Sequence, residues 1–177
     1  MATRIVLLRG VNLGSSRRVR MEALRELLGA RGYGNVRTFL QSGNVVLETP
    51  AGGKQLESSL ERELADGLGF EVDVFVRTPA ELAAVLERDP FAGTATDGSR
   101  YLVTFLRRAP TKAVVTRLAA VDLAPEQLAV SGREIYSWHP GGVGRSELAK
   151  LLSERALGIA ATARNWNTLE KLLALAE

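Results

Sequence analysis

The stretch Gln41–Lys54 reads QSGNVVLETPAGGK, and the stretch Val130–Arg145 reads VSGREIYSWHPGGVGR. In both, a Ser-Gly pair leads into an apolar run, and a proline and paired glycines follow at a short distance. A Ser-Gly turn beside such a run is typical of a β-hairpin, because glycine readily adopts the left-handed backbone of a tight turn. The two stretches therefore predict hairpins at equivalent places in a duplicated chain.

The same order of elements surrounds both hairpins. In the first half, apolar patterning predicts strands over 3–9, 35–40, 45–48 and 70–77, and helices over 21–32, 54–67 and 78–90. In the second half it predicts strands over 100–106, 128–130, 134–138 and 159–163, and helices over 111–121, 146–157 and 167–176. This order predicts an α+β protein, a tandem duplication of two ferredoxin-like βαββαβ units with a trailing helix each, over 1–92 and 99–177.

This topology has a consequence for the loops. In a ferredoxin-like unit the first and second strands run the same way, so the loop after the first strand and the following hairpin lie at one end of the sheet. We therefore expect the loop 10–20 to lie beside the hairpin turn 41–44. In the second half the same rule brings Arg107, Arg108 and Lys112 to the turn 131–134, which predicts two basic edges.

Composition narrows the class of protein. The chain has 177 residues and a formal net charge of +3, with 23 Lys and Arg against 20 Asp and Glu. It has no cysteine and one histidine, which excludes disulfides, thiolate metal sites and sites built on several histidines. The apolar run Ile5–Leu8 is shorter than a signal-peptide core, and no run approaches the roughly 20 apolar residues of a spanning helix. We expect a cytoplasmic protein with no membrane association.

The loop after the first predicted strand is the strongest candidate for a binding site. Between Arg9 and Arg20 it carries Gly10, Asn12, Gly14, Arg17 and Arg18, and a helix starts after it. Glycine lets backbone amides approach an anion, a helix N-terminus favours negative charge, and arginine supplies paired donors. The competing interpretation is a long connection with solvated arginines, in which the glycines only serve turn geometry.

Two other segments combine residues of chemical interest. GGVGRS, 141–146, lies between a strand and a helix, but an incomplete Walker pattern favours a turn in which Ser146 caps the next helix. In RNWNT, Trp166 suits base stacking or core packing, and Asn167 with Glu170 resembles a helix cap. His139 would need an orienting partner, which the sequence does not identify. Nucleophile-elbow, zinc-protease and dinucleotide-binding motifs are absent, so we expect no cofactor and no metal.

The runs LLRGVNLG, MEALRELL, GYGNVRTFLQSGNVV, HPGGVGRSEL and ATARNWNTLEKLL resemble the mainly bacterial family catalogued as domain of unknown function 1697. The resemblance covers nearly the whole chain and implies two related ferredoxin-like halves, with no established activity, cofactor or substrate. The family's recurrent positions map onto Arg9, Gly10, Asn12, Gly14, Gln41, Ser42, Gly43, Asn44, Ser146, Arg164, Asn165, Trp166, Asn167 and Thr168. Members often carry a basic residue near Ser15 or Ser16, and a lysine where this chain has Glu147, which weakens a phosphate-loop interpretation of the second segment.

Three functional hypotheses follow. The first is a binding module for a phosphate-bearing ligand, a nucleotide or single-stranded nucleic acid, at the edge of the first unit. The second is a phosphoryl or acyl-phosphate hydrolase, since acylphosphatases resemble this layout; Arg9 or Arg17 and Asn44 would then act on phosphate and water. The third is a protein-interaction scaffold, as a monomer or homodimer. The predicted ligand-binding residues are Arg9, Gly10, Asn12, Gly14, Arg17, Arg18, Gln41, Ser42, Asn44, Ser146, Arg164, Asn165 and Trp166.

Overall fold

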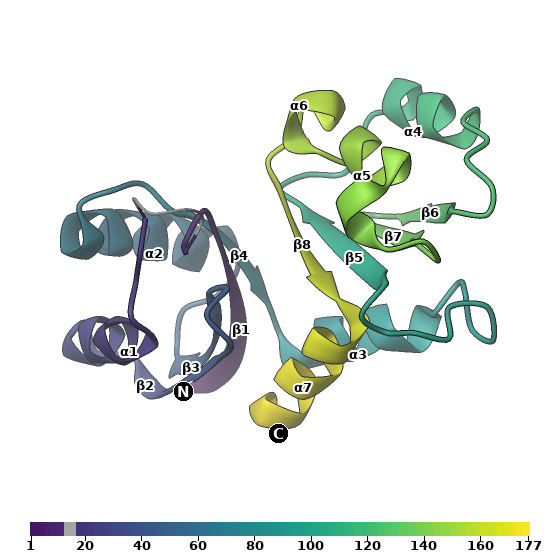
Figure 1. The fold of residues 1–177 in the computed structure, drawn as a ribbon. Helices are drawn as coiled ribbons and strands as arrows, with labels where there is room; N and C mark the ends of the chain where they lie inside the picture. Colours follow the sequence, from purple (N-terminus) through teal and green to yellow (C-terminus); the bar gives the residue numbers. More distant parts are fainter. Residues whose placement is uncertain (13–16) are drawn as a thin grey trace. The chain divides into compact units, whose positions relative to one another are not determined.

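Two four-stranded antiparallel sheets with helices form an α+β structure in the computed structural model, which describes residues 1–12 and 17–177 (Figure 1). The first sheet consists of β1 (Ala2–Arg9), β2 (Gly34–Phe39), β3 (Asn44–Thr49) and β4 (Asp73–Arg77), with helices α1 (Met21–Ala30), α2 (Gly53–Leu68) and α3 (Pro79–Arg88). The second consists of β5 (Tyr101–Leu106), β6 (Gln127–Ser131), β7 (Glu134–Trp138) and β8 (Ala161–Asn165). Its helices are α4 (Lys112–Ala119), α5 (Glu147–Leu151), α6 (Glu154–Leu157) and α7 (Trp166–Ala176), and a short 3₁₀ turn covers Val143–Arg145.

The two sheets share one strand order. The first runs β2-β3-β1-β4 and the second β6-β7-β5-β8, so the first strand of each sheet pairs with its third and fourth. Because β1 and β2 both pair antiparallel with β3, they run in the same direction. Leu8 N–H donates to Gly43 O at 2.8 Å, and Leu106 N–H donates to Arg133 O at 2.8 Å. Each hairpin turn therefore lies beside the end of the first strand of its sheet, as predicted.

The core of the first unit lies between its sheet and the helices α1 and α2. Leu56, Leu60 and Leu64 recur every four residues on α2 and are at most 1% exposed. They pack in one cluster with alternate sheet residues such as Val6 and Val45. The helical spacing of the leucines on α2 places them on one face of the helix. The alternation of side chains along the strands places the valines on the face of the sheet that packs against them.

The second unit departs from prediction in its last helices and strand. The predicted helix 146–157 is interrupted, since α5 ends at Leu151 and α6 begins at Glu154. Ser153 Oγ donates to Lys150 O at 2.7 Å and accepts from Ala156 N–H, so its side chain ends one helix and caps the next. Gly158 then turns left-handed at φ 65°, and the last strand starts at Ala161, where it pairs with Leu106.

The chain divides into two compact units. The first comprises Met1–Ala84 with Lys171–Glu177, and the second Val85–Glu170, so the division falls inside α3 and α7. The domain bounds 1–92 and 99–177 stay a prediction about the duplicated halves. Among the described ranges, every helix is too short or too polar to traverse a lipid bilayer.

Candidate functional site

Asn12 ties the loop after β1 to the neighbouring hairpin. Its backbone is left-handed at φ 55°, a conformation that asparagine tolerates better than most residues. Its Oδ1 accepts from Val19 N–H at 2.8 Å, and its Nδ2 donates to Val19 O at 3.1 Å and to Gln41 O. The predicted binding residue Asn12 therefore uses its amide inside the protein.

Gly43 permits this close packing, and Gly10 gives the loop a left-handed backbone. Gly43 has φ 76°, and a Cβ there would lie 2.6 Å from Val11 Cγ2 and 2.7 Å from Leu8 Cβ. Gly10 has φ 83°, and a Cβ there would lie 3.1 Å from Arg17 Nη1. The turn and the loop thus meet where a side chain would obstruct them.

The hairpin residues divide into an inward and an outward set. Asn44 is fully buried, and its Nδ2 donates to Phe39 O and to Ser42 Oγ, both at 2.9 Å. Gln41 and Ser42 are exposed, as is Arg18 on the loop. Of these predicted binding residues, Asn44 is buried and the other three are exposed, although the Ser42 hydroxyl also accepts from Asn44.

A pocket of about 710 Å³ lies against the first unit's loop, and we call it the first-unit pocket. Its lining comes from the loop, from α2 and from the start of β4: Arg9, Gly10, Arg17, Ser58, Glu61, Arg62, Ala65, Glu71, Val72 and Asp73. Arg9 Nη1 lies 2.9 Å from Asp73 Oδ2, and the Arg17 guanidinium lies 5.7 Å from the Phe70 ring centroid. The structure thus brings together the predicted residues Arg9, Gly10 and Arg17, and Gly14 lies outside the described residues.

Charges of both signs line this pocket. Three guanidinium groups, of Arg9, Arg17 and Arg62, face three carboxylates, of Glu61, Glu71 and Asp73. Guanidinium groups hold phosphate or carboxylate oxygens, and carboxylates accept from hydroxyl or amino groups. Sequence reasoning missed the acidic set, because those residues lie on α2, on the connection after it and at the start of β4, far along the chain from the basic loop.

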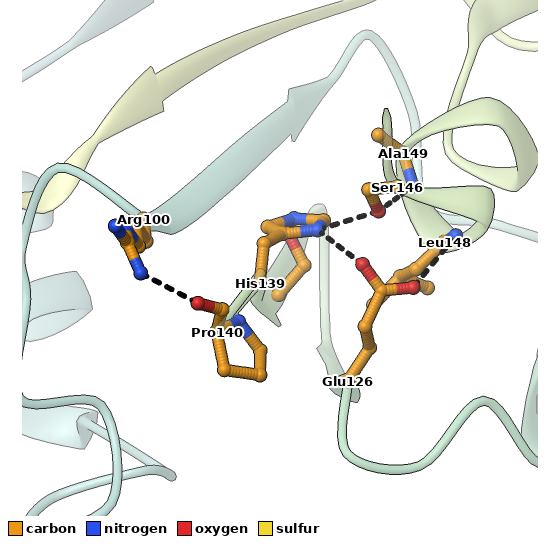
Figure 2. A network of polar contacts seen from close by, with 8 residues as sticks. Arg100, Glu126, His139, Pro140, Ser146, Leu148 and Ala149 are labelled. Carbon is orange, nitrogen blue, oxygen red and sulfur yellow. Dashed lines mark hydrogen bonds and ion pairs between the residues drawn. The ribbon is translucent and has the colours of Figure 1, made fainter. Parts of the chain in front are cut away.

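The second unit contains a buried polar network around His139 (Figure 2). His139 Nδ1 lies 2.8 Å from Ser146 Oγ and 3.3 Å from Glu126 Oε1, and Nε2 lies 2.8 Å from Ser137 Oγ. The carboxylate only accepts, so the ring nitrogen that faces it carries hydrogen. The structure therefore supplies the orienting partner, Glu126, that the sequence did not identify.

Glu126 and Ser146 also hold the start of α5. Glu126 Oε2 accepts from Leu148 N–H at 3.2 Å, and Ser146 Oγ accepts from Ala149 N–H at 2.9 Å, which confirms Ser146 as a helix cap. Burial raises the pKa of the Glu126 carboxyl. The hydrogen bonds from Ser146, from Leu148 N–H and from His139 outweigh burial, so the pKa of Glu126 is lowered from its ordinary value.

The order of contacts from Ser137 through His139 to Glu126 is that of a catalytic triad. Ser137 and His139 are each only 1% exposed, so neither the hydroxyl nor the imidazole can meet a substrate. Glu126 and Ser146 border a cavity of about 470 Å³ with Gly141, Gly142 and Arg145 on its wall. We therefore interpret the network as one that holds the Gly-Gly turn against α5.

The RNWNT segment packs into the second unit. Arg164 is 9% exposed, and its Nη1 donates to Thr162 Oγ1 and Ala163 O, both at 2.8 Å; burial lowers its pKa to about 10. Asn165 Oδ1 accepts from Thr168 N–H at 2.9 Å, so the helix cap expected at Asn167 lies at Asn165 instead. The Trp166 ring stacks on that of Tyr101, with centroids 4.4 Å apart.

The fold and the site define a two-sheet α+β protein with a mixed-charge pocket beside its first strand. Within the ranges 1–12 and 17–177, no group of three or more His, Cys, Asp or Glu side chains could hold a metal ion. The model of the family described as "Protein of unknown function (DUF1697)" matches residues 1–136, and the chain belongs to this family, as the sequence resemblance predicted.

Other comparisons bear on the fold. No curated protein matches the chain. The solved structure of the conserved bacterial protein SP0830 from Streptococcus pneumoniae is similar, with a TM-score of 0.73 and 23% identity over 99% of this chain and 98% of that one. At this identity the likeness shows the fold alone.

Proposed function

We propose that the first-unit pocket binds a small phosphate-bearing ligand of nucleotide size. The observation that carries the proposal is the meeting of Arg9, Gly10 and Arg17 at one pocket, with Arg62 of α2 beside them. Planar guanidinium groups form paired hydrogen bonds with phosphate oxygens. Arg17 is already directed to the pocket, since its guanidinium lies against Phe70 and close to Gly10.

The acidic lining favours a particular kind of phosphate ligand. Glu61, Glu71 and Asp73 would repel a bare anion, but their oxygens accept hydrogen bonds from sugar hydroxyls or an amino group. A volume of about 710 Å³ lies within the usual range for small-molecule sites. A nucleotide, which combines phosphate with such donors, fits these charges better than inorganic phosphate.

The aromatic residues of the second sheet do not support binding of single-stranded nucleic acid there. Single strands bind to proteins largely by stacking of bases on exposed aromatic rings. Tyr101, Phe105 and Tyr136, the candidates on the second sheet, are at most 1% exposed. These three rings therefore offer no stacking platform.

A binding experiment tests the proposal. AMP should raise the melting temperature of the protein more than inorganic phosphate does, because a ligand that binds only the folded state stabilises it. Arg17→Ala should abolish the AMP shift, and Arg37→Ala, which removes an exposed arginine of β2, should leave it intact. The absence of any shift with AMP, or an equal shift in Arg17→Ala, would refute the proposal.

The fold carries a related proposal, namely that both units are ferredoxin-like and arose by tandem duplication. The common strand order supports it. So does the register: Leu7 pairs with Asn44 and Ile5 with Arg77, and Phe105 pairs with Glu134 and Val103 with Arg164. The buried arginines Arg77 and Arg164 thus hold matching positions. Superposition of the two units in an experimental structure is the test.

The hydrolase hypothesis requires Asn44 to orient a water molecule. Both hydrogens of its amide are directed to Phe39 O and Ser42 Oγ within the hairpin, and the residue is fully buried. We therefore propose binding at the first-unit pocket and no hydrolysis there.

A further inference from the structure

Three connecting segments of the second unit meet at the end of the sheet where β5 ends. Leu106 N–H donates to Arg133 O at 2.8 Å, which brings in the β6–β7 turn. Arg107 N–H donates to Ala160 O at 2.9 Å, which brings in the segment before β8. Arg117 Nη2 of α4 donates to Ala156 O of α6 at 2.7 Å, and Figure 1 shows both helices at the same end of this unit.

This end of the unit concentrates positive charge. We call it the second-unit basic edge, and its cations are Arg107, Arg108, Lys112, Arg117, Arg133 and Arg155. The same segments carry two carboxylates, Glu134 and Glu154. Six cations against two carboxylates leave an excess of four, which is more than the +3 of the whole chain. These segments therefore carry a net positive charge at this end of the unit.

At the matching end of the first unit, an acidic residue lies opposite the arginine that ends the first strand. There Arg9 pairs in register with Asp73, and their side chains form an ion pair at 2.9 Å. In the second sheet, Arg107 corresponds to Arg9, and the residue opposite it is Ala160. The two edges thus differ in the residue that lies opposite this arginine, and the charged side chains of the second edge are mostly cations, which suits it to an anion.

We propose that the second-unit basic edge binds the phosphate backbone of double-stranded nucleic acid. Arg108, Lys112, Arg117 and Arg155 are exposed, and five of the six cations are arginines, whose planar groups pair with phosphate oxygens. The segments that form the edge contain no aromatic residue on which an unpaired base could stack. A duplex presents phosphates at twice the axial density of one strand, which favours it for this edge.

Fluorescence anisotropy with a labelled duplex of about 20 base pairs, at salt from about 50 to 200 mM, tests this inference. We expect the duplex to bind more tightly than a single strand of the same length. The logarithm of the affinity should fall with the logarithm of salt with a slope of about −3 to −4, as about four neutralised phosphates require.

Substitutions locate the surface. The double variant Arg108→Ala, Lys112→Ala should weaken binding and reduce the slope by about 2, because each lost phosphate contact removes about 0.9. Arg37→Ala and Arg17→Ala, which remove arginines of the first unit, should bind the duplex like the unaltered protein. The two proposals can therefore fail separately. If AMP does not bind to the first-unit pocket, the expected effects of these substitutions on duplex binding remain the same.

Three results would overturn the inference. They are no duplex binding at low salt, equal binding by the double variant with native circular dichroism, and displacement of the duplex by polyglutamate at equal charge concentration. The last result would assign the edge to an acidic protein instead of a nucleic acid.

Discussion

The side chain of Asn12 donates a hydrogen bond to the main-chain carbonyl of Gln41, 29 residues further along the chain. This bond joins the loop after β1 to the turn between β2 and β3. The same side chain closes the loop on itself through Val19. An asparagine that the composition of the loop predicts for binding thus holds the loop against the hairpin.

Replacement of Asn12 should destabilise the protein. Asn12→Ala removes three hydrogen bonds and retains the left-handed backbone, so we expect a loss of about 2 to 4 kcal/mol at about 1 kcal/mol for each bond plus strain. Asn12→Gly removes the same bonds but relieves the backbone, and should lose less. Urea unfolding measures both. Equal stability of Asn12→Ala and the unaltered protein would contradict the observed contacts.

The cap residues of α5 and α6 form a matched pair for a second prediction. Ser146 and Ser153 each cap a helix, but Ser146 Oγ also contacts buried His139 at 2.8 Å. Ser153→Ala should cost about 1 kcal/mol, as loss of a cap does. Ser146→Ala should cost about 1 to 3 kcal/mol more, since it also leaves a buried polar partner unsatisfied. Thermal unfolding of the two variants should therefore give a lower midpoint for Ser146→Ala.

Glu126 makes the stability of the second unit depend on acidity. The pKa of its carboxyl is raised by burial but lowered overall by its hydrogen bonds, below the ordinary value of 4.5. A carboxyl with a lowered folded-state pKa contributes stability above its ordinary pKa, and this contribution is lost as pH falls through the folded-state pKa. The free energy of unfolding, measured in urea at a series of pH values, should therefore decrease below about pH 4.5.

The matched control is Glu147→Gln, at an exposed carboxyl whose Lys150 partner is also exposed. Glu126→Gln should be less stable at neutral pH and show a shallower acid decline than the unaltered protein. Glu147→Gln should keep the decline. If Glu126→Gln and the unaltered protein lose stability in the same way as pH falls, the Glu126 carboxyl does not contribute to the pH dependence of unfolding.

Local patterns account for what could be predicted of the fold. The strand predicted over 134–138 is observed as Glu134–Trp138, and the helix predicted to start at residue 21 begins at Met21. The break at Ser153 was not predicted, because leucine spacing continues through it while the serine bonds to the backbone. The last strand lies two residues later than predicted at each end, because pairing with β5 fixes its register.

The candidate site was predictable only in part. The basic loop is visible in the sequence, because Arg9, Gly10 and Arg17 lie within a few residues of one another. The carboxylates that balance it are not, since Asp73 is 64 residues from Arg9 and reaches it through the pairing of β1 with β4. Glu126 likewise lies 13 residues from His139 with no motif to connect them.

The sequence by itself determined the order of the elements and the places of the turns. The spacing of apolar residues and the turn preference of glycine depend only on residues close together in the chain. The two hairpins and the repeated order of strands and helices therefore follow from local sequence patterns. Only the tertiary structure decided which charges meet. Strand register sets Asp73 against Arg9 in one sheet and Ala160 against Arg107 in the other, so the residue that faces the corresponding arginine differs between the two sheets.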